Sequence, residues 1–423
     1  MSTAATSAVT NEEASAGFPS GYSRASFVIL VLLCLAYAIN AADRQLFPTL
    51  LPPIREAFGW DLQTSGLLST VFTLGLAVVG IPAGYLVDRA SRKTIILVAM
   101  VTYSVFTLAT IQAQGFWDML IYRALTGVGE GVQMAALFAA IGSYFYRKRS
   151  LFIGWLIVAY GLGAFLGPRV GAWLYLAAGS WRAPFIWFAA SGLVIAATVL
   201  VFVPKNFTES KGPQCDSAVV QAALEHMPTN LWNRNVIMCF IGCVVLGFSL
   251  YGFMSLYAVF LKEELGFSGT DIAAAFSFFG LGGLMSLIGG WCGDRFPQRW
   301  VIAAAFSCLA AVGYCMYNIA RGVGTQSLLT FLTGVFGSGF VFVNLLSLLQ
   351  RSVRPEMVGR ASGVFLTALF GAGSVAGYLF GSLVGAFGWG GAGLIELTLF
   401  PIIGVITMVM VNPKHLIAVA AKP

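Results

Sequence analysis

Long apolar runs alternate with short polar connections along almost the whole chain. Twelve of these runs reach about 20 residues, the length that a helix needs to cross a hydrocarbon layer roughly 30 Å thick. Because lipid offers no hydrogen-bond partner to the backbone, each run is predicted to be a helix. The runs lie near residues 26–50, 65–87, 94–113, 117–145, 151–177, 184–203, 236–260, 271–292, 301–320, 325–349, 361–386 and 391–411.

The composition is that of an integral membrane protein. Hydrophobic residues make up 58% of the 423 positions and charged residues only 10%, whereas a soluble domain carries about 25% charged residues. We therefore expect an all-α membrane protein with twelve transmembrane helices. Residues 1–25 are polar and contain no apolar stretch of their own, so no cleaved signal peptide is expected.

The formal charge of +7 could indicate a nucleic-acid partner, but the positions of the basic residues argue against one. Lys and Arg concentrate in the N-terminal tail, the even-numbered connections and the C-terminus. Only Arg55, Arg182, Lys262 and Arg321 lie in the other connections. This asymmetry follows the positive-inside rule. It predicts cytoplasmic termini in a multi-pass protein of the plasma membrane, which in a bacterium is the inner membrane.

A polar stretch from Lys205 to Asn235 divides the predicted helices into six and six. The halves echo each other, since "GYLVDRASRK" (84–93) follows the second helix and "GGWCGDRFPQR" (289–299) follows the eighth. Paired six-helix halves are typical of transporters built from internal repeats. The predicted organisation is a cytoplasmic tail (1–25), a six-helix bundle (26–204), a cytoplasmic central loop (205–235), a second six-helix bundle (236–411) and a cytoplasmic tail (412–423).

Two predicted helices carry glycines at four-residue spacing. Such ridges let helix backbones approach closely, and they also allow corresponding helices of the two halves to rock against each other, as alternating access requires. The glycines are Gly163, Gly167 and Gly171 in the fifth helix and Gly373, Gly377, Gly381 and Gly385 in the eleventh.

Six ionisable residues interrupt the predicted spans. A charged side chain that faces lipid at the bilayer centre costs roughly 2.5–3.5 kcal/mol on the gentlest insertion scale. These side chains should therefore face the protein interior and find partners there. They are Asp43, Arg44, Arg123, Glu130, Arg169 and Glu396.

Four of these residues are expected to form one site. Asp43 and Arg44 diverge by about 100° on a helix, so neither simply neutralises the other and their partners must come from another helix. Arg123 and Glu130 are two turns apart on one face of the fourth helix, about 10 Å along the axis. A structural ion-pair network is one interpretation, although desolvation offsets most of the attraction in a buried pair. A site that alternately binds an anion and a proton needs both kinds of group.

Three motifs resemble those of the major facilitator superfamily. They are "GYLVDRASRK", the fourth-helix sequence "RALTGVGEG" (123–131) and the fifth-helix sequence "GAFLGP" (163–168). Together with twelve spans and a central loop, the resemblance covers the whole chain. In that family the loop motif makes charged contacts that close the cytoplasmic side. The resemblance assigns this gating role to Gly84, Asp88, Arg89, Arg92 and Lys93, and to Asp294 and Arg295 of the echoed motif, whereas ordinary positive-inside anchoring is the alternative.

The four charged residues resemble those of two branches of that superfamily. One is the anion:cation symporter branch, which moves sugar acids and other organic anions, and the other is the Spinster branch of lysolipid transporters. The resemblance implies that Asp43 and Glu130 couple protons and that Arg44 and Arg123 bind the anion or gate the site. Asn40 matches an asparagine common to these branches, whereas Ala41 stands where they commonly carry tyrosine.

The remaining candidates have a structural and a functional interpretation each. Arg169 either contacts the anion or extends along a helix interface, and Glu396 is expected to be a solvated or interfacial carboxylate near the outer end of the last helix. Further substrate contacts, or else packing and interhelical hydrogen bonds, are expected from Tyr37, Tyr160, Tyr251 and Asn344.

No enzyme or pump motif is present, because the chain lacks GxxxxGK[ST], HExxH and GxSxG. The seven cysteines form no metal-type CxxC pair. We expect a monomeric secondary transporter without cofactor or metal, which takes up a small organic anion, a carboxylate, together with protons. A Spinster-like proton-coupled transporter of lysolipids or other amphiphiles is the alternative.

Overall fold

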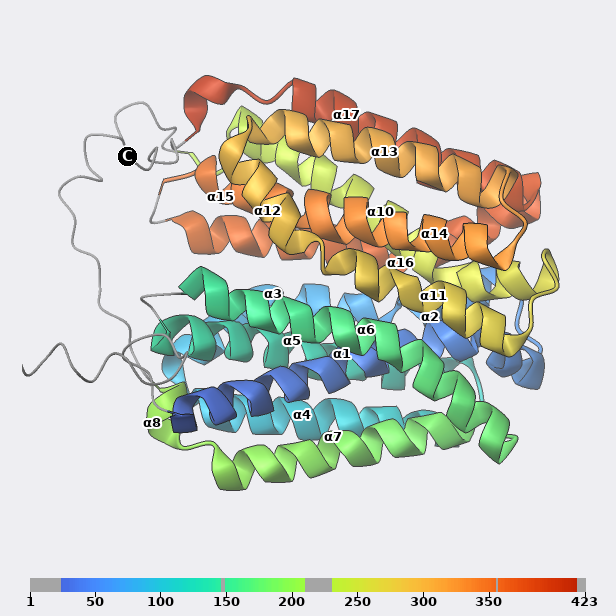
Figure 1. The fold of residues 1–423 in the computed structure, drawn as a ribbon, viewed down its shortest axis with the longest axis horizontal. Helices are drawn as coiled ribbons and strands as arrows, with labels where there is room; N and C mark the ends of the chain where they lie inside the picture. The colour runs from blue at the N-terminus through green and yellow to red at the C-terminus, as the bar shows by residue number, and fades with distance from the viewer. Residues whose placement is uncertain (1–23, 146–148, 210–229, 355–356, 417–423) are drawn as a thin grey trace, which may run out of the picture.

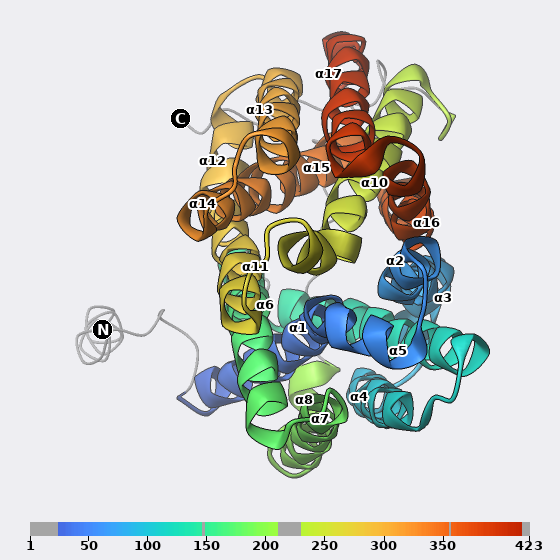
Figure 2. The same cartoon turned by 90° about the vertical axis from the view of Figure 1, so that its right-hand side faces the viewer.

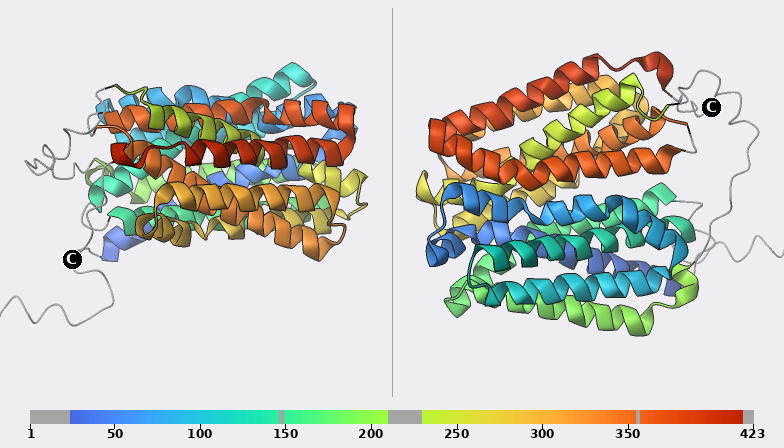
Figure 3. Two further views of the ribbon diagram at one scale, coloured as in Figure 1. Left: turned by 90° about the horizontal axis from the view of Figure 1, so that it is seen from above. Right: turned by 180° about the vertical axis from the view of Figure 1, so that it is seen from behind.

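The computed structural model describes residues 24–145, 149–209, 230–354 and 357–416, and all regular secondary structure in these ranges is helical. The helices run roughly parallel to the long axis of the molecule and gather in two bundles (Figure 1). Helices before residue 209 form the N-terminal bundle, in blue and green, and those after residue 234 form the C-terminal bundle, in yellow to red (Figures 1 and 3).

Eight helices and one 3₁₀ turn make up the N-terminal bundle. In chain order they are α1 (Arg24–Phe58), α2 (Leu62–Thr70), α3 (Phe72–Arg89), α4 (Arg92–Ala109), the 3₁₀ turn η1 (Thr110–Gln112), α5 (Phe116–Tyr144), α6 (Arg149–Ala178), α7 (Arg182–Phe202) and the short α8 (Lys205–Thr208).

The C-terminal bundle contains two π-helical segments among its α-helices. Its elements are α10 (Arg234–Glu263), α11 (Gly269–Gly283), α12 (Ser286–Arg295), α13 (Gln298–Asn318), α14 (Val323–Thr333), the π-helix η3 (Gly334–Phe342), α15 (Val343–Arg351), α16 (Val358–Ala392), the π-helix η5 (Gly393–Leu399), α17 (Phe400–Val409) and the 3₁₀ turn η6 (Pro413–His415).

Eleven helical segments within the described ranges are long and apolar enough to cross a membrane. The last of these, Arg360–Val409, is 50 residues long, and inside it Gly388 adopts φ 70° and ψ 176°, where two helices meet at a kink. Glycine suits this position because an L side chain is strained at positive φ. The sequence pattern placed a boundary at this point, between the runs 361–386 and 391–411.

Three prolines lie in the second half of α1: Pro48, Pro52 and Pro53. A proline has no amide hydrogen, so each leaves the carbonyl four residues earlier without its helical partner. For Pro48 that carbonyl belongs to Arg44. At the next position, the hydroxyl of Thr49 donates to the carbonyl of Gln45 at 2.7 Å.

The bundles meet chiefly where α2 and α3 pack on α16 and where α6 packs on α11, and α1 and α2 also contact α10. The end-on view shows α2 beside α16 and α6 beside α11 (Figure 2). Glycines permit this approach: a Cβ on Gly66 of α2 would lie 2.0 Å from the carbonyl oxygen of Gly377 on α16. A Cβ on Gly280 of α11 would lie 2.4 Å from the backbone nitrogen of Phe165 on α6. The glycine ridge of the eleventh predicted helix therefore lies, at Gly377, between the bundles.

Two ion pairs join the bundles where α1 and α10 end, which we call the distal end, the right-hand end in Figure 1. Arg55 of α1 pairs with Glu263 of α10, and Lys262 of α10 pairs with Glu56 of α1. Arg55 also donates through Nε to the carbonyl of Trp60 at 2.9 Å. Charges from both bundles thus alternate across one contact.

Candidate functional site

The charged residues of α1 and α5 meet inside the N-terminal bundle. Nε of Arg44 donates to Oε2 of Glu130 at 2.9 Å, and the two side chains are 3% and 0% exposed. The pair joins helices 86 residues apart in sequence. As expected from helix geometry, the partner of Arg44 is on another helix and not the adjacent Asp43.

Asp43 is hydrogen-bonded to a third helix, α4. Its Oδ2 accepts a hydrogen bond from the hydroxyl of Thr107 on α4 at 2.7 Å, and its Oδ1 has no hydrogen-bond partner among the described residues. The carboxyl group is buried. Successive positions of α1 therefore address different neighbours, Asp43 towards α4 and Arg44 towards α5.

An amide pair extends this cluster along the α1–α5 contact. Asn40 donates through Nδ2 to Oε1 of Gln133 at 2.7 Å, while its Oδ1 accepts from Nη2 of Arg44 at 3.2 Å. Arg44 is therefore held on two sides, by Glu130 and by Asn40. Its guanidinium also lies 5.7 Å from the ring centre of Tyr160 and 5.8 Å from that of Phe72.

Arg123 is buried beside this network without being bound by it. None of its three guanidinium nitrogens has a hydrogen-bond partner in the described part of the chain. Its guanidinium carbon lies 4.9 Å from the ring centre of Phe47 and 5.6 Å from that of Phe72. Cation–π contact offsets only part of the loss of hydration. The group keeps its full capacity to bind a planar anion through a fork of N–H donors.

Aromatic side chains line the cluster, and one of them comes from the C-terminal bundle. Tyr37 and Tyr160 pack against each other with ring centres 5.6 Å apart. Tyr251 of α10 contacts Phe72 at 6.0 Å, the ring shared by both arginines. The structure thus brings together Tyr37, Tyr160 and Tyr251 with the four charged residues, at a point where the two bundles touch.

The comparison with known families decides the identity of the fold. The sequence profile described as Major Facilitator Superfamily matches residues 33–377. The chain belongs to the Major Facilitator Superfamily. Its relatives are transporters and not enzymes.

Relatives within the superfamily include transporters of organic acids. The chain is 25% identical to a hexuronate transporter of Bacillus subtilis (strain 168), over 74% of this chain and 75% of that protein. It is 24% identical to the 4-hydroxybenzoate transporter PcaK of Pseudomonas putida, over 87% and 86%. It is 28% identical to protein spinster homolog 3 of Danio rerio, but this match covers 53% of the chain and only 46% of that protein.

A solved structure of the superfamily has the same fold. It is a crystal structure of a bacterial homolog to the human lysosomal transporter Spinster, in an inward-facing and unoccupied conformation. The TM-score is 0.71 over 93% of this chain and 97% of that chain, at 18% identity.

The loop motif of the superfamily contacts its own bundle. Lys93 donates through Nζ to the carbonyl of Leu200 at 2.8 Å, and Arg92 donates to the carbonyls of Ala139 and Thr208, both at 3.4 Å. Arg89 is exposed and lies over the ring of Tyr85 at 5.8 Å. Gly84 is exposed, and a Cβ at this position would meet no described atom within 4 Å. The side chain of Asp88 lies outside the described residues.

Glu209 anchors the start of α4 in this motif. Its Oε1 accepts from the hydroxyl of Ser91 at 2.9 Å and from the backbone amide of Lys93 at 3.2 Å. Partial burial raises the pKa of Glu209, but these hydrogen bonds outweigh it and hold the pKa below its ordinary value. The echoed motif is exposed at Asp294 and Arg295, and Arg295 lies 5.4 Å from the ring centre of Trp291.

Two predicted substrate contacts are found elsewhere. Asn344 lies in the C-terminal bundle, where its Nδ2 donates to the carbonyls of Gly289 at 2.8 Å and Phe340 at 2.9 Å. Its Oδ1 accepts from Gln298 at 3.3 Å. These bonds tie α15 to α12 and α13, so the structure does not bring Asn344 into the charged cluster.

Arg169 lies at the interface of α6 and α11. Its guanidinium stacks over Phe165 at 4.1 Å and faces Phe278 of α11 at 5.5 Å, and Nη1 donates to the carbonyl of Phe165 at 3.5 Å. Of the two interpretations of this residue, the geometry corresponds to the helix interface.

The expectation of a solvated Glu396 is wrong. The residue is 0% exposed, and neither carboxyl oxygen has a hydrogen-bond partner within the described ranges. The prediction failed because position along a span gives depth in the membrane but not the face of the helix. Glu396 points inward, towards α10.

The sequence interpretation also missed polar members of the cluster. Gln133 is three residues after Glu130 and therefore on the same helix face, a signal that was available. Thr107 offered none, because a threonine in an apolar helix is common and usually bonds its own backbone.

Proposed function

We propose that this chain is a secondary active transporter that carries a small organic anion, a carboxylate, together with protons by alternating access. One observation carries the proposal: Arg123 is buried with an unused fork of donors, next to an ion pair and a second carboxyl group. A carboxylate matches that fork through two parallel hydrogen bonds. The names of the hexuronate and 4-hydroxybenzoate transporters support the same class of substrate.

The surrounding rings favour an anion with an apolar body. Phe47, Phe72 and Tyr251 flank the guanidinium groups, and Phe370 packs on Tyr251 at 6.1 Å. An aromatic ring packs favourably against such rings when the ring centres are about 4.5–7 Å apart. An aromatic carboxylate would therefore pair its charge with Arg123 and pack its ring against the surrounding aromatic side chains.

Protons act through the two carboxyl groups. While Glu130 is ionised it holds Arg44 through a charge-assisted hydrogen bond, and the field of Asp43 and Glu130 opposes an incoming anion. Protonation of the carboxyl groups removes that opposition and leaves the arginines for the substrate. Each net positive charge carried inward gains about 2.3 kcal/mol per 100 mV of membrane potential.

The proposed membrane arrangement has twelve spans, six in each bundle, with both termini in the cytoplasm of a bacterium. Counting the helices on either side of Gly388 separately adds one pass to the eleven candidate spans. The distal end then faces outward, and its two ion pairs close that side. The superfamily's rocking bundles would open it by separating α2 from α16 and α6 from α11.

The deciding experiment is substrate-driven proton uptake in proteoliposomes. We expect 4-hydroxybenzoate, gallate or a hexuronate to drive alkalinisation of the outer medium, and Glu130→Gln to abolish accumulation against a gradient while leaving counterflow. Glu264→Gln is the matched control, because Glu264 is exposed at the distal end and pairs only with Arg321, at 3.8 Å, among the residues described. Accumulation by Glu130→Gln at the control's level would refute the coupling role.

A second candidate is a proton-coupled transporter of lysolipids. The sequence match to Spinster homologs favours it. An amphiphile needs room for an acyl chain, so lysophospholipids but not short carboxylates should then compete with the transported substrate and raise the melting temperature of the purified protein.

A further inference from the structure

Glu396 is a buried carboxyl group that the charged cluster does not use. It lies in η5, a π-helical segment of the last span, and it is fully buried. No Lys or Arg of the described residues lies within 4.0 Å of it, and neither oxygen is hydrogen-bonded there. An isolated carboxylate in such surroundings costs several kcal/mol, so the group is expected to hold a proton.

The place of this carboxyl group is built by a glycine. A Cβ on Gly252 of α10 would lie 2.2 Å from Oε1 of Glu396, so any side chain at that position would displace the carboxyl group. The hydroxyl of Ser249, one turn earlier on α10, donates to the main-chain oxygen of Glu396 at 3.4 Å. Glu396 is therefore packed directly on the backbone of α10.

Four elements surround η5: α10, α13, α16 and α17. Tyr317 of α13 is the titratable group packed beside η5, since a Cβ on Gly393 would lie 2.7 Å from Cβ of Tyr317, and its hydroxyl has no hydrogen-bond partner among the described residues. Helix α17 carries no charged residue, and Arg360 and Tyr378 of α16 are exposed. On α10, Tyr257 bonds instead to Gln326 and Thr330, and Lys262 and Glu263 are in the distal ion pairs.

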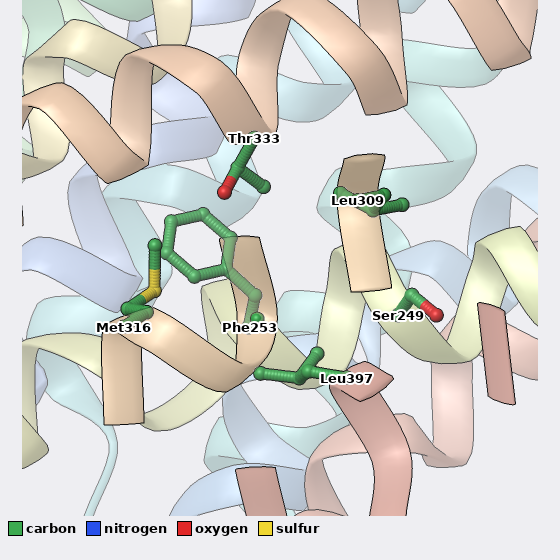
Figure 4. A pocket seen from close by; sticks show the side chains of 7 residues that line it. Ser249, Phe253, Leu309, Met316, Thr333 and Leu397 are labelled. Carbon is green, nitrogen blue, oxygen red and sulfur yellow. The ribbon is translucent and has the colours of Figure 1, made fainter. Parts of the chain in front are cut away.

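A cavity of about 10 Å³, room for about one water molecule, lies between α10, α13 and η5, next to the residue that follows Glu396. Ser249 and Phe253 of α10, Met316 of α13 and Leu397 of η5 line it (Figure 4). Two of these residues are in direct connection with Glu396, Leu397 as the next residue and Ser249 through its hydrogen bond. The cavity therefore lies beside the backbone of Glu396, whereas the carboxyl group itself packs on Gly252.

We propose that Glu396 is a proton-binding site of the C-terminal bundle, separate from Asp43 and Glu130. In this conformation Glu396 holds a proton, and it exchanges that proton with water when α10 moves away from η5. The step is simple: the carboxyl O–H bond breaks, its proton passes to water, and a carboxylate remains. The inference rests on the alternation proposed above, but not on the identity of the anion.

Helix α10 connects this site with the others. Tyr251 faces the arginines of the N-terminal bundle, the next residue Gly252 faces Glu396, and Lys262 and Glu263 close the distal end. Separation of the two bundles alone would leave α10 on η5, so Glu396 is uncovered only if α10 also moves relative to the rest of its own bundle when the distal ion pairs separate. A proton bound more tightly in one of two conformations biases the equilibrium by up to about tenfold per pH unit.

The first test is infrared spectroscopy of the purified full chain, in a variant with Asp43→Asn and Glu130→Gln so that the cluster is silent. We expect the band of a protonated carboxyl group at neutral pH, although an ordinary glutamate titrates near pH ~4.3. Glu396→Gln added to this background should remove the band, whereas Glu264→Gln should not. If Glu396→Gln leaves the spectrum unchanged, Glu396 is ionised and the proposal fails.

The second test is the pH profile of substrate counterflow in proteoliposomes, with Glu396→Gln and Glu396→Asp in the otherwise unsubstituted chain. Because Glu396→Gln cannot lose a proton, the fall of its counterflow rate at alkaline pH should disappear or move to another pH. Glu396→Asp should restore this fall at a shifted pH. If the band disappears but both profiles match the unsubstituted protein, Glu396 is a buried acid without a part in transport, which overturns the proposal. Absence of proton movement in the unsubstituted protein would instead refute the proposed function, and the infrared result would stand.

Discussion

Arg44 and Arg123 carry the same group in different surroundings. Arg44 is bound to Glu130 and Asn40, whereas Arg123 has aromatic rings beside it and no hydrogen-bond partner among the residues described. Because a bound guanidinium resists displacement and an unbound one does not, we assign Arg123 to the anion and Arg44 to the response to protons.

Lysine substitutions separate these two roles. Lysine keeps the charge but not the planar fork, so Arg123→Lys should weaken carboxylate binding by about 10- to 100-fold, which is about 1.5–3 kcal/mol for a hydrogen bond to a charged group. Arg44→Lys should mainly change the pH dependence of binding, because lysine cannot bond Glu130 and Asn40 in the same geometry. Calorimetric titration at two pH values measures both. Equal losses of affinity that do not depend on pH would contradict this division.

Part of the site could be predicted at this scale. Burial of charge required partners for Asp43 and Arg44 on other helices, and the two-turn spacing of Arg123 and Glu130 placed them on one face. The bond of Asp43 to Thr107 could not be predicted, because it depends on how α4 is rotated about its axis. Nor could the isolation of Arg123, since a sequence does not say which neighbours lie beyond reach.

At the scale of elements, glycines mark two kinds of helix contact. Gly75 of α3 faces α5 within the N-terminal bundle, where a Cβ would lie 2.2 Å from the carbonyl oxygen of Ala124. Gly377 of α16 faces α2 of the other bundle. The first contact belongs to the fold of one bundle, whereas the second must separate if the bundles move.

Alanine at Gly75 and at Gly66, the glycine of α2 that contacts Gly377, should therefore have different effects. Gly75→Ala should lower the melting temperature of the purified protein, because overpacking inside a bundle typically costs about 1–3 kcal/mol. Gly66→Ala should change the melting temperature little and slow transport, since the three atoms nearest to its Cβ all belong to Gly377 of the other bundle and the clash is relieved when the bundles part. Melting curves and transport rates of the two variants provide the comparison. A similar loss of stability in both would show that α2 and α16 stay together.

The apolar runs predicted most elements because hydrophobic length is a direct property of the sequence. They could not reveal the π-helical segments η3 and η5, which change the hydrogen-bond register without changing composition. Glu396 lies in one of them.

At the scale of the whole molecule, the distal ion pairs hold the bundles together on one side only weakly. An exposed pair contributes about 0.2–1 kcal/mol, and the side chains here are 23% to 68% exposed. We expect ion pairs of this strength to favour the closed distal end while leaving the equilibrium between closed and open conformations reversible.

Charge reversal at these ion pairs should shift the conformation. Lys262→Glu places a negative charge beside Glu56, so the distal end should open more often, and Glu56→Lys combined with Lys262→Glu should restore closure. The readout is labelling by a membrane-impermeant maleimide of a cysteine introduced at the buried Ser65, with the native cysteines replaced. The labelling rate should rise in Lys262→Glu and return to that of the unsubstituted distal end in the double variant. Unchanged labelling would mean that the pair of Lys262 with Glu56 does not hold this end closed.

The family was readable from sequence at this scale, because its motifs recur at fixed places along the chain. The packing of the two bundles against each other could not be predicted from the sequence. That depends on contacts between side chains hundreds of residues apart, such as those of Arg55 with Glu263.

The prolines of α1 give this helix a soft joint. Pro48 removes the backbone bond to the carbonyl of Arg44, directly after the residues that grip α4 and α5, and Pro52 and Pro53 repeat the loss before the ion-paired Arg55. The stretch before the prolines is bonded to α4 and α5, and the stretch after them is held to α10 through Arg55 and Glu56. We therefore expect that, once the exposed distal ion pairs separate, a bend of α1 at these prolines opens that end with a smaller movement than rotation of a whole bundle.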